Sequence, residues 1–207
     1  MSDFRKQLAE QAKKSAEENL KNHRVRQRHR DGDTVRLWRC DNNGSSVYHF
    51  TVCAPPGWLI VYGDMGECMW SRTPDMIGFA RESIGSIGYF SEKVSRDCKI
   101  REQRSELITE FLAEYEGRHA LNYGEVMTKA EREVLAELRD SWNGSEDIEA
   151  FLREFFDSDL CHDSESMPDV NAFTYHYLWK VEALKWFLAK LDAGEVVVDP
   201  YDWSAQK

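Results

Sequence analysis

The sequence predicts an α+β fold, with an antiparallel sheet of three to five strands covered by C-terminal helices and an N-terminal helical arm. Between residues 34 and 72, short β-branched and aromatic runs alternate with turn residues, which is typical of strands. Between residues 105 and 192, apolar residues recur with helical spacing. We therefore expect a basic helical arm and linker over residues 1–30 and a single α+β domain over residues 31–207.

The N-terminal segment predicts a helix over residues 3–22 that begins at Ser2 or Asp3. Its apolar residues form a thin stripe, which is too narrow for a core helix: Phe4, Leu8, Ala12, Ala16 and Leu20. Residues 23–30 (HRVRQRHR) are basic and lack apolar periodicity, so we interpret them as a linker before a turn at residues 31–33.

Four strands are predicted at residues 34–40, 46–54, 58–62 and 67–72. Their connections are short, which favours an antiparallel meander. The run 195–199 (EVVVD) is a candidate for a further strand at the edge of the sheet.

The sequence GDMG, with Gly63, Asp64 and Gly66, separates two of these runs and raises the question of a phosphate-binding loop. Such a loop usually leads into a helix N-terminus, whereas this one leads into a strand and lacks the lysine of a P-loop. Two glycines around Asp-Met satisfy the positive φ angles of a tight turn without a ligand. We therefore predict a structural hairpin turn.

The helical part begins with short helices near residues 75–94 and continues with longer amphipathic ones. A capping box at Thr128–Glu131 opens one helix, and residues 166–169 (SMPD) are expected to open the last, which ends at Gly194. The predicted inward residues of the three helices between residues 105 and 160 are Leu107, Ile108, Phe111, Leu112, Tyr115, Val134, Leu135, Leu138, Trp142, Ile148, Phe151, Leu152, Phe155 and Phe156.

Composition and charge narrow the class of protein. The N-terminus lacks the apolar segment of a signal peptide, and the longest apolar run is too short for a membrane span. The five cysteines form no C-x-x-C pair, so a reducing, cytoplasmic compartment is expected. The net charge of −10 is uneven, with +5 over residues 1–30 and −14 over residues 105–207.

This asymmetry defines two candidate binding surfaces. The acidic one, which would dock on a basic protein, comprises Glu146, Asp147, Glu149, Glu154, Asp157, Asp159, Asp163 and Glu165. The basic one, which would contact nucleic acid or a second partner, comprises Lys21, Arg24, Arg26, Arg28 and Arg30. A solvated helix surface and a solvated linker are the respective structural alternatives.

Candidate catalytic and metal-binding residues form no recognisable constellation. Ligand-type side chains gather near the C-terminal helix: Asp157, Asp159, Cys161, His162, Asp163 and His176. Their spacing matches no standard site, so we predict no metal centre, although metal binding by Cys161, His162 and His176 stays open. Cys53 and His49 are too far apart on a strand to act as a nucleophile and base. We expect no cofactor and no enzymatic activity.

Residues Ser46–Val94 resemble a set of bacteriophage and prophage proteins of unassigned function. The shared features are an alternating strand, the GDMG turn, an aromatic strand and a GYFSEKV element. The residues that carry the resemblance are Gly63, Asp64, Gly66, Trp70, Gly88, Tyr89, Phe90, Glu92 and Lys93. The resemblance implies an accessory protein in the cytoplasm of an infected bacterium. These proteins have no agreed catalytic residues, so the resemblance assigns none to this sequence.

The sequence thus predicts a non-enzymatic phage protein that docks on a host protein or nucleoprotein complex with a basic surface. Inhibition of a defence system, as by anti-CRISPR proteins, is the role suggested by analogy. The alternatives are a nucleic-acid-binding protein that uses the basic arm and an enzyme with an unrecognised site. A homodimer through the N-terminal helix also stays open, because the thin apolar stripe of that helix needs a neighbour.

Overall fold

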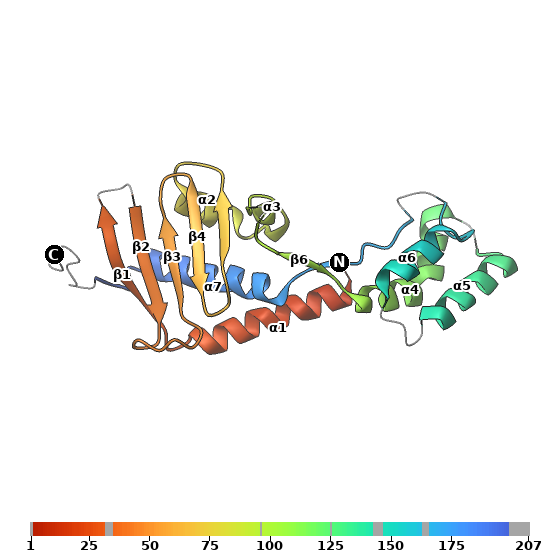
Figure 1. Cartoon of the computed structure of the whole chain (residues 1–207), viewed down its shortest axis with the longest axis horizontal. Helices are drawn as coiled ribbons and strands as arrows, with labels where there is room; N and C mark the ends of the chain where they lie inside the picture. The colour runs from red at the N-terminus through yellow and green to blue at the C-terminus, as the bar shows by residue number, and fades with distance from the viewer. Residues whose placement is uncertain are drawn as a thin grey trace. The chain divides into compact units, whose positions relative to one another are not determined.

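The computed structural model describes residues 2–31, 35–95, 97–124, 126–142, 147–162 and 166–198, and its architecture confirms the predicted α+β class (Figure 1). The chain forms two compact units. The sheet unit comprises Leu8–Ile100 and Phe173–Lys207, and the helical unit comprises Met1–Gln7 and Arg101–Ala172.

The sheet unit contains a six-stranded sheet, more strands than predicted, in the order β5-β4-β3-β2-β1-β8. The strands are β1 (Arg24–Asp31), β2 (Val35–Asp41), β3 (Phe50–Ala54), β4 (Trp58–Gly63), β5 (Cys68–Ser71) and β8 (Val196–Val198). Strands β1 to β5 pair antiparallel in sequence order, which confirms the predicted meander. Strand β8 pairs with β1 in parallel at the edge, so the sheet is mixed.

The prediction of a linker over residues 23–30 is wrong, because most of this segment is strand β1. Its arginine-rich sequence has a single strongly apolar residue, Val25, which is buried opposite Cys40 of β2. One buried side chain and a ladder of main-chain hydrogen bonds are sufficient for a strand whose other face is polar. Hydrophobic periodicity could not reveal it.

Alternation along the strands divides the sheet into two faces. Register places Trp38, Val52, Val61 and Cys68 in one row across four strands, and all four are buried. This face packs against helices α1 (Asp3–Leu20), α2 (Met76–Ser83), α3 (Ile87–Ser91) and α7 (Tyr175–Asp192), which contribute side chains to the same core.

Two of these helices differ from the prediction. The apolar stripe of the N-terminal helix is predicted to be too thin for a core helix, but its residues Ala12, Ala16 and Leu20 are buried in its own chain. The last helix does not begin at SMPD. Its N-cap is Thr174, whose hydroxyl oxygen accepts a hydrogen bond from the main-chain N–H of Tyr177 at 3.1 Å. A short strand precedes this cap, because residues 171–173 pair with another strand.

The helical unit consists mainly of α4 (Ser105–Tyr123), α5 (Lys129–Trp142) and α6 (Ile148–Phe156), together with β6 (Arg101–Gln103), which pairs with β7 (Asn171–Phe173). The inward residues predicted for these helices form its core or pack against it, with two exceptions: Leu107 is buried outside this cluster, and Phe156 is exposed. The predicted capping box is confirmed: the Thr128 N–H donates to Glu131 and the Glu131 N–H donates to the Thr128 hydroxyl.

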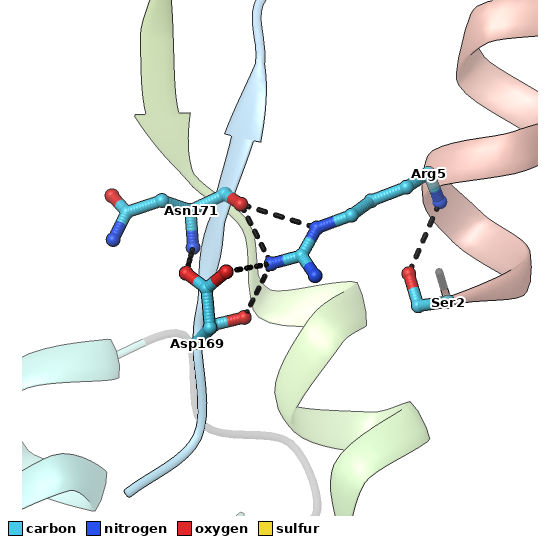
Figure 2. Close-up of polar contacts among 4 residues, drawn as sticks. All are labelled: Ser2, Arg5, Asp169 and Asn171. Carbon is cyan, nitrogen blue, oxygen red and sulfur yellow. Dashed lines mark hydrogen bonds and ion pairs between the residues drawn. The ribbon is translucent and has the colours of Figure 1, made fainter. Parts of the chain in front are cut away.

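Within the helical unit, Arg5 in the first turn of α1 contacts the segment that contains Asp169 and Asn171 (Figure 2). Its guanidinium group donates to the carbonyl oxygens of Asp169 (2.7 Å) and Asn171 (2.8 Å) and pairs with the Asp169 carboxylate. The guanidinium group is planar and carries several N–H donors, so it can contact these two carbonyl oxygens and the carboxylate together. Among the described residues, no helix is long and apolar enough to cross a membrane.

Candidate functional site

The second face of the sheet, here called the open face, carries the outward-facing residues of strands β1 to β5. We define it by Arg24, Arg26, Leu37, Arg39, Thr51, Cys53, Trp58, Ile60, Tyr62 and Met69. Helix α7 lies behind the sheet in Figure 1, and within the described part of the chain no helix covers the face turned toward the viewer. A sheet face without a covering layer is available for contact with another molecule.

An apolar row runs across the middle of the open face. Register aligns Leu37, Cys53, Ile60 and Met69 on four neighbouring strands. Each of the four is half-buried, and none of them is among the described side chains that pack against the core of the sheet unit. They therefore present apolar surface outward.

Two aromatic side chains flank this row on strand β4. Trp58 is 42% exposed and Tyr62 is 44% exposed, whereas Leu59 and Val61 between them are buried. Residues four apart on a strand lie on the same face, about 13 Å from each other. Large, stiff side chains at this spacing are suited to anchor a partner at two points.

A second row, at the Tyr62 side, brings two arginines next to each other. Arg26 of β1 lies opposite Arg39 of β2, and both pair with the buried carboxylate of Asp41, at 3.2 Å and 2.8 Å. Burial alone would raise the pKa of Asp41. The N–H of Gly44 and the two arginines outweigh this effect and hold that pKa below its usual value. The carboxylate therefore stays ionised and fixes both guanidinium groups along the sheet.

Four of the five predicted basic residues lie on strand β1, and Lys21 lies in the turn that precedes it. Lys21 and Arg24 are exposed, and Arg26 is engaged by Asp41. Arg28 is half-buried beside a register shift of β1, and the side chain of Arg30 lies outside the described residues. The basic segment is therefore part of the sheet, and one of its arginines shares a carboxylate with Arg39 of β2.

The predicted acidic residues belong to the helical unit, and the described ones are exposed. Asp147 caps α6 by accepting from the Ala150 N–H at 2.9 Å, Glu149 accepts from Gln103, and Glu154 accepts from Ser141. Asp157 and Asp159 follow α6. Glu146, Asp163 and Glu165 lie outside the described residues. The whole helical unit carries nine Lys/Arg and 20 Asp/Glu, a net charge of −11.

The GDMG segment connects β4 to β5, which pair antiparallel. Asp64 accepts a hydrogen bond from the Tyr48 N–H at 2.8 Å, and Gly66 has a φ angle of 81°. At Gly63 an added Cβ would overlap the carbonyl oxygen of His49, so only glycine permits this close approach. The conformation of the segment is thus explained by local packing and hydrogen bonds.

Of the six ligand-type residues named from the sequence, Asp163 lies outside the described residues, and the other five do not gather at one point. His176 lies on α7 in the sheet unit, and the Cys161 sulfur lies 3.6 Å from that of Met167. His162 instead approaches His119 of α4 and Glu131 of α5, with the ligand atoms of the three within 4.8 Å of one another. Sequence reasoning missed His119 and Glu131 because no short-range spacing links them to His162.

The chain matches no protein-family model, no curated protein and no solved structure. Its function is therefore argued from the geometry of these sites.

Proposed function

We propose that this chain is a non-enzymatic binding protein that docks on a protein partner through the open face of its sheet. The observation that carries the proposal is the exposure of Trp58 and Tyr62 on either side of an apolar row, on a sheet face that no described helix covers. Burying such a surface against a partner removes apolar area from water, and aromatic anchors concentrate the binding free energy.

The composition of the face favours a protein over a nucleic acid. Aromatic residues, methionine and arginine are enriched at the cores of protein interfaces, and Trp58, Tyr62, Met69 and Arg39 provide all of these. Nucleic-acid binding depends instead on many cations that face phosphates. Here Asp41 already neutralises one of the two adjacent arginines, which leaves a modest positive charge suited to an acidic rim on the partner.

The biological setting that we propose is a bacteriophage infection. The stretch that resembles phage proteins, Ser46–Val94, includes strands β3, β4 and β5 and therefore both exposed aromatics. We propose that the partner is a host protein or nucleoprotein complex in the bacterial cytoplasm and that docking inhibits a defence system.

The test is affinity capture from a bacterial lysate with the full-length chain as bait. The variant Trp58→Ala/Tyr62→Ala is compared with Tyr89→Ala, which removes an aromatic of similar exposure (42%) that lies on α3. Proteins that the native chain and Tyr89→Ala retain, and that the double variant loses, are identified, purified and titrated against each bait. Equal capture by all three baits would refute docking at the open face, and loss of capture after nuclease treatment would indicate nucleic acid instead.

A second candidate surface is the acidic helical unit, which would dock on a basic protein surface. The observation that favours it is the net charge of −11 in this unit, against +1 in the sheet unit. Charge reversal by Glu149→Lys and Glu154→Lys should then abolish a salt-sensitive interaction that Trp58→Ala/Tyr62→Ala retains. A partner that is indifferent to both charge reversals would exclude this surface.

A further inference from the structure

The cluster of His119, Glu131 and His162 combines two imidazoles and one carboxylate from three separate elements of the helical unit. His119 lies on α4, Glu131 in the first turn of α5, and His162 follows α6. The potential ligand atoms all lie within 4.8 Å of one another. Residues 12 and 31 positions apart in sequence thus converge on one point.

We propose that these three side chains form a binding site for a divalent transition-metal ion, with Zn²⁺ as the expected ion. Imidazole nitrogen and carboxylate oxygen are the ligands of zinc sites with three protein donors, in which a water molecule completes the coordination. The same donor set also accommodates Fe²⁺ or Mn²⁺. An exclusively oxygen-binding ion such as Ca²⁺ does not fit two histidines.

The spacing of the donors suits an ion better than a direct contact. Nε2 of His119 and Oε1 of Glu131 are 3.8 Å apart, longer than a hydrogen bond. Ligand atoms around a tetrahedral zinc ion are separated by about 3.4 Å, since each lies about 2.0–2.1 Å from the metal. A contraction of at most about 1.4 Å brings the three donors to that separation, and the side chain of His162, which is exposed, is the one free to move.

Two of the donors are already oriented by their neighbours. Glu131 is the acidic member of the capping box, and its Oε2 accepts from the Thr128 N–H at 2.6 Å. This bond holds the carboxylate with Oε1 directed toward His119. Hydrogen bonds of this kind, from a neighbouring group to a ligand, orient the ligand and raise metal affinity.

The histidine on α4 is held on a packed helix face. His119 is only 6% exposed and lies one turn after Tyr115. The Tyr115 hydroxyl donates to the carbonyl oxygen of Leu160 at 2.8 Å, which fixes the chain two residues before His162. The buried end of the site is therefore preorganised, whereas His162 leaves the outer side accessible to an ion and to water.

The electrostatic environment favours a cation. The helical unit carries a net charge of −11, and with both imidazoles neutral the three donors themselves carry −1. A bound divalent ion reverses the local sign and ties α4, α5 and the segment after α6 together. We therefore expect metal binding to stabilise the helical unit.

The experiment is a zinc titration of the tag-free full-length protein after dialysis against a chelator, followed by calorimetry and by the visible d–d absorption of substituted Co²⁺. We expect one ion per chain and a rise in melting temperature. Glu131→Gln should lower the affinity at least about tenfold while retaining an oxygen for the Thr128 N–H, and His162→Ala should do the same. His176→Ala removes an exposed histidine from the sheet unit and should leave the affinity unchanged.

Far-ultraviolet circular dichroism of each variant establishes that it is folded before titration. The proposal is overturned if the folded native protein binds no stoichiometric Zn²⁺ or Co²⁺. It is equally overturned if His162→Ala and Glu131→Gln bind as tightly as the native chain, or if His176→Ala loses affinity to the same extent.

Discussion

The ammonium group of Lys180 on α7 donates a hydrogen bond to the main-chain carbonyl oxygen of Glu67 at 3.0 Å. It donates a second bond to the carbonyl of Met65 at 3.2 Å, and the lysine is only 7% exposed. Both acceptors belong to the connection between β4 and β5, so a buried lysine fastens the GDMG turn to the helix behind the sheet. This turn adjoins the strand that carries Trp58 and Tyr62, and its anchoring keeps the end of the open face in place.

Replacing this lysine should therefore loosen the turn. We expect Lys180→Met to lower the free energy of unfolding by about 1–3 kcal/mol, because two carbonyl groups lose their donor while the aliphatic volume is retained. Urea denaturation measures the change. Lys185→Met, on the same helix with its partner Glu182, is the control and should change the stability by about 0.5 kcal/mol or less. A more stable Lys180→Met variant would show that burial of the ammonium group costs more than its hydrogen bonds contribute.

The buried carboxylate of Asp41 should be important for stability, because it holds two arginines of the open face, Arg26 and Arg39. Asp41→Asn leaves Arg26 and Arg39 side by side without their shared carboxylate, and we expect a loss of about 2–4 kcal/mol at pH 7. The pKa of Asp41 is lower in the folded state than in the unfolded state. The contribution of Asp41 to the free energy of unfolding is therefore present above pH 3.8 and is lost as the pH falls through the folded pKa.

The pH dependence and a surface pair provide the controls. The difference in the free energy of unfolding between the native protein and Asp41→Asn should become smaller below about pH 4. Asp192→Asn breaks the exposed ion pair with Arg81 and should cost about 1 kcal/mol or less. Equal effects of the two substitutions would contradict a special role for Asp41.

The two glycines of the turn should differ in their tolerance of alanine. Gly63→Ala forces a Cβ into the main chain at His49, so we expect a loss of about 3 kcal/mol or more. In Gly66→Ala the added Cβ meets no main-chain atom, so the variant loses only about 1 kcal/mol, the cost of an alanine at a positive φ angle. Thermal unfolding of both variants checks the order, and a Gly66→Ala variant less stable than Gly63→Ala would contradict the close approach at His49.

Buried thiols should make the sheet unit sensitive to alkali. Burial raises the pKa of Cys68 from 9.0 to about 12. Between these values the unfolded chain loses a proton that the folded chain keeps, so the stabilisation present below pH 9 is lost progressively as the pH rises. The slope from this one group is about 1.4 kcal/mol per pH unit.

Urea denaturation between pH 8 and 10.5 measures this dependence in native protein and in Cys68→Ala, which should show a shallower decline. Val61→Ala serves as the control, because Val61 lies opposite Cys68 on β4 and has no titratable group. The loss in the free energy of unfolding caused by Val61→Ala should be independent of pH. A decline of equal slope in Cys68→Ala would assign the alkaline sensitivity to another group.

Several elements were predictable because their signals lie in adjacent residues. The run WLIVY over residues 58–62, which is apolar and lies between the turn residues PPG and GDMG, marks β4 directly. The capping box at Thr128–Glu131 marks the start of α5 in the same way. In contrast, β1 has a single inward apolar residue, Val25, and is a strand because β2 and β8 lie on either side of it.

The sequence by itself determined the α+β class, the meander and the inward faces of the helices, since these depend on residues a few positions apart. The tertiary structure alone decided that Trp58 and Tyr62 flank an uncovered apolar row and that Arg26 and Arg39 share Asp41. It also brought His162 to His119 and Glu131. Such contacts depend on strand register and helix packing between distant segments, and no local pattern of residues records them.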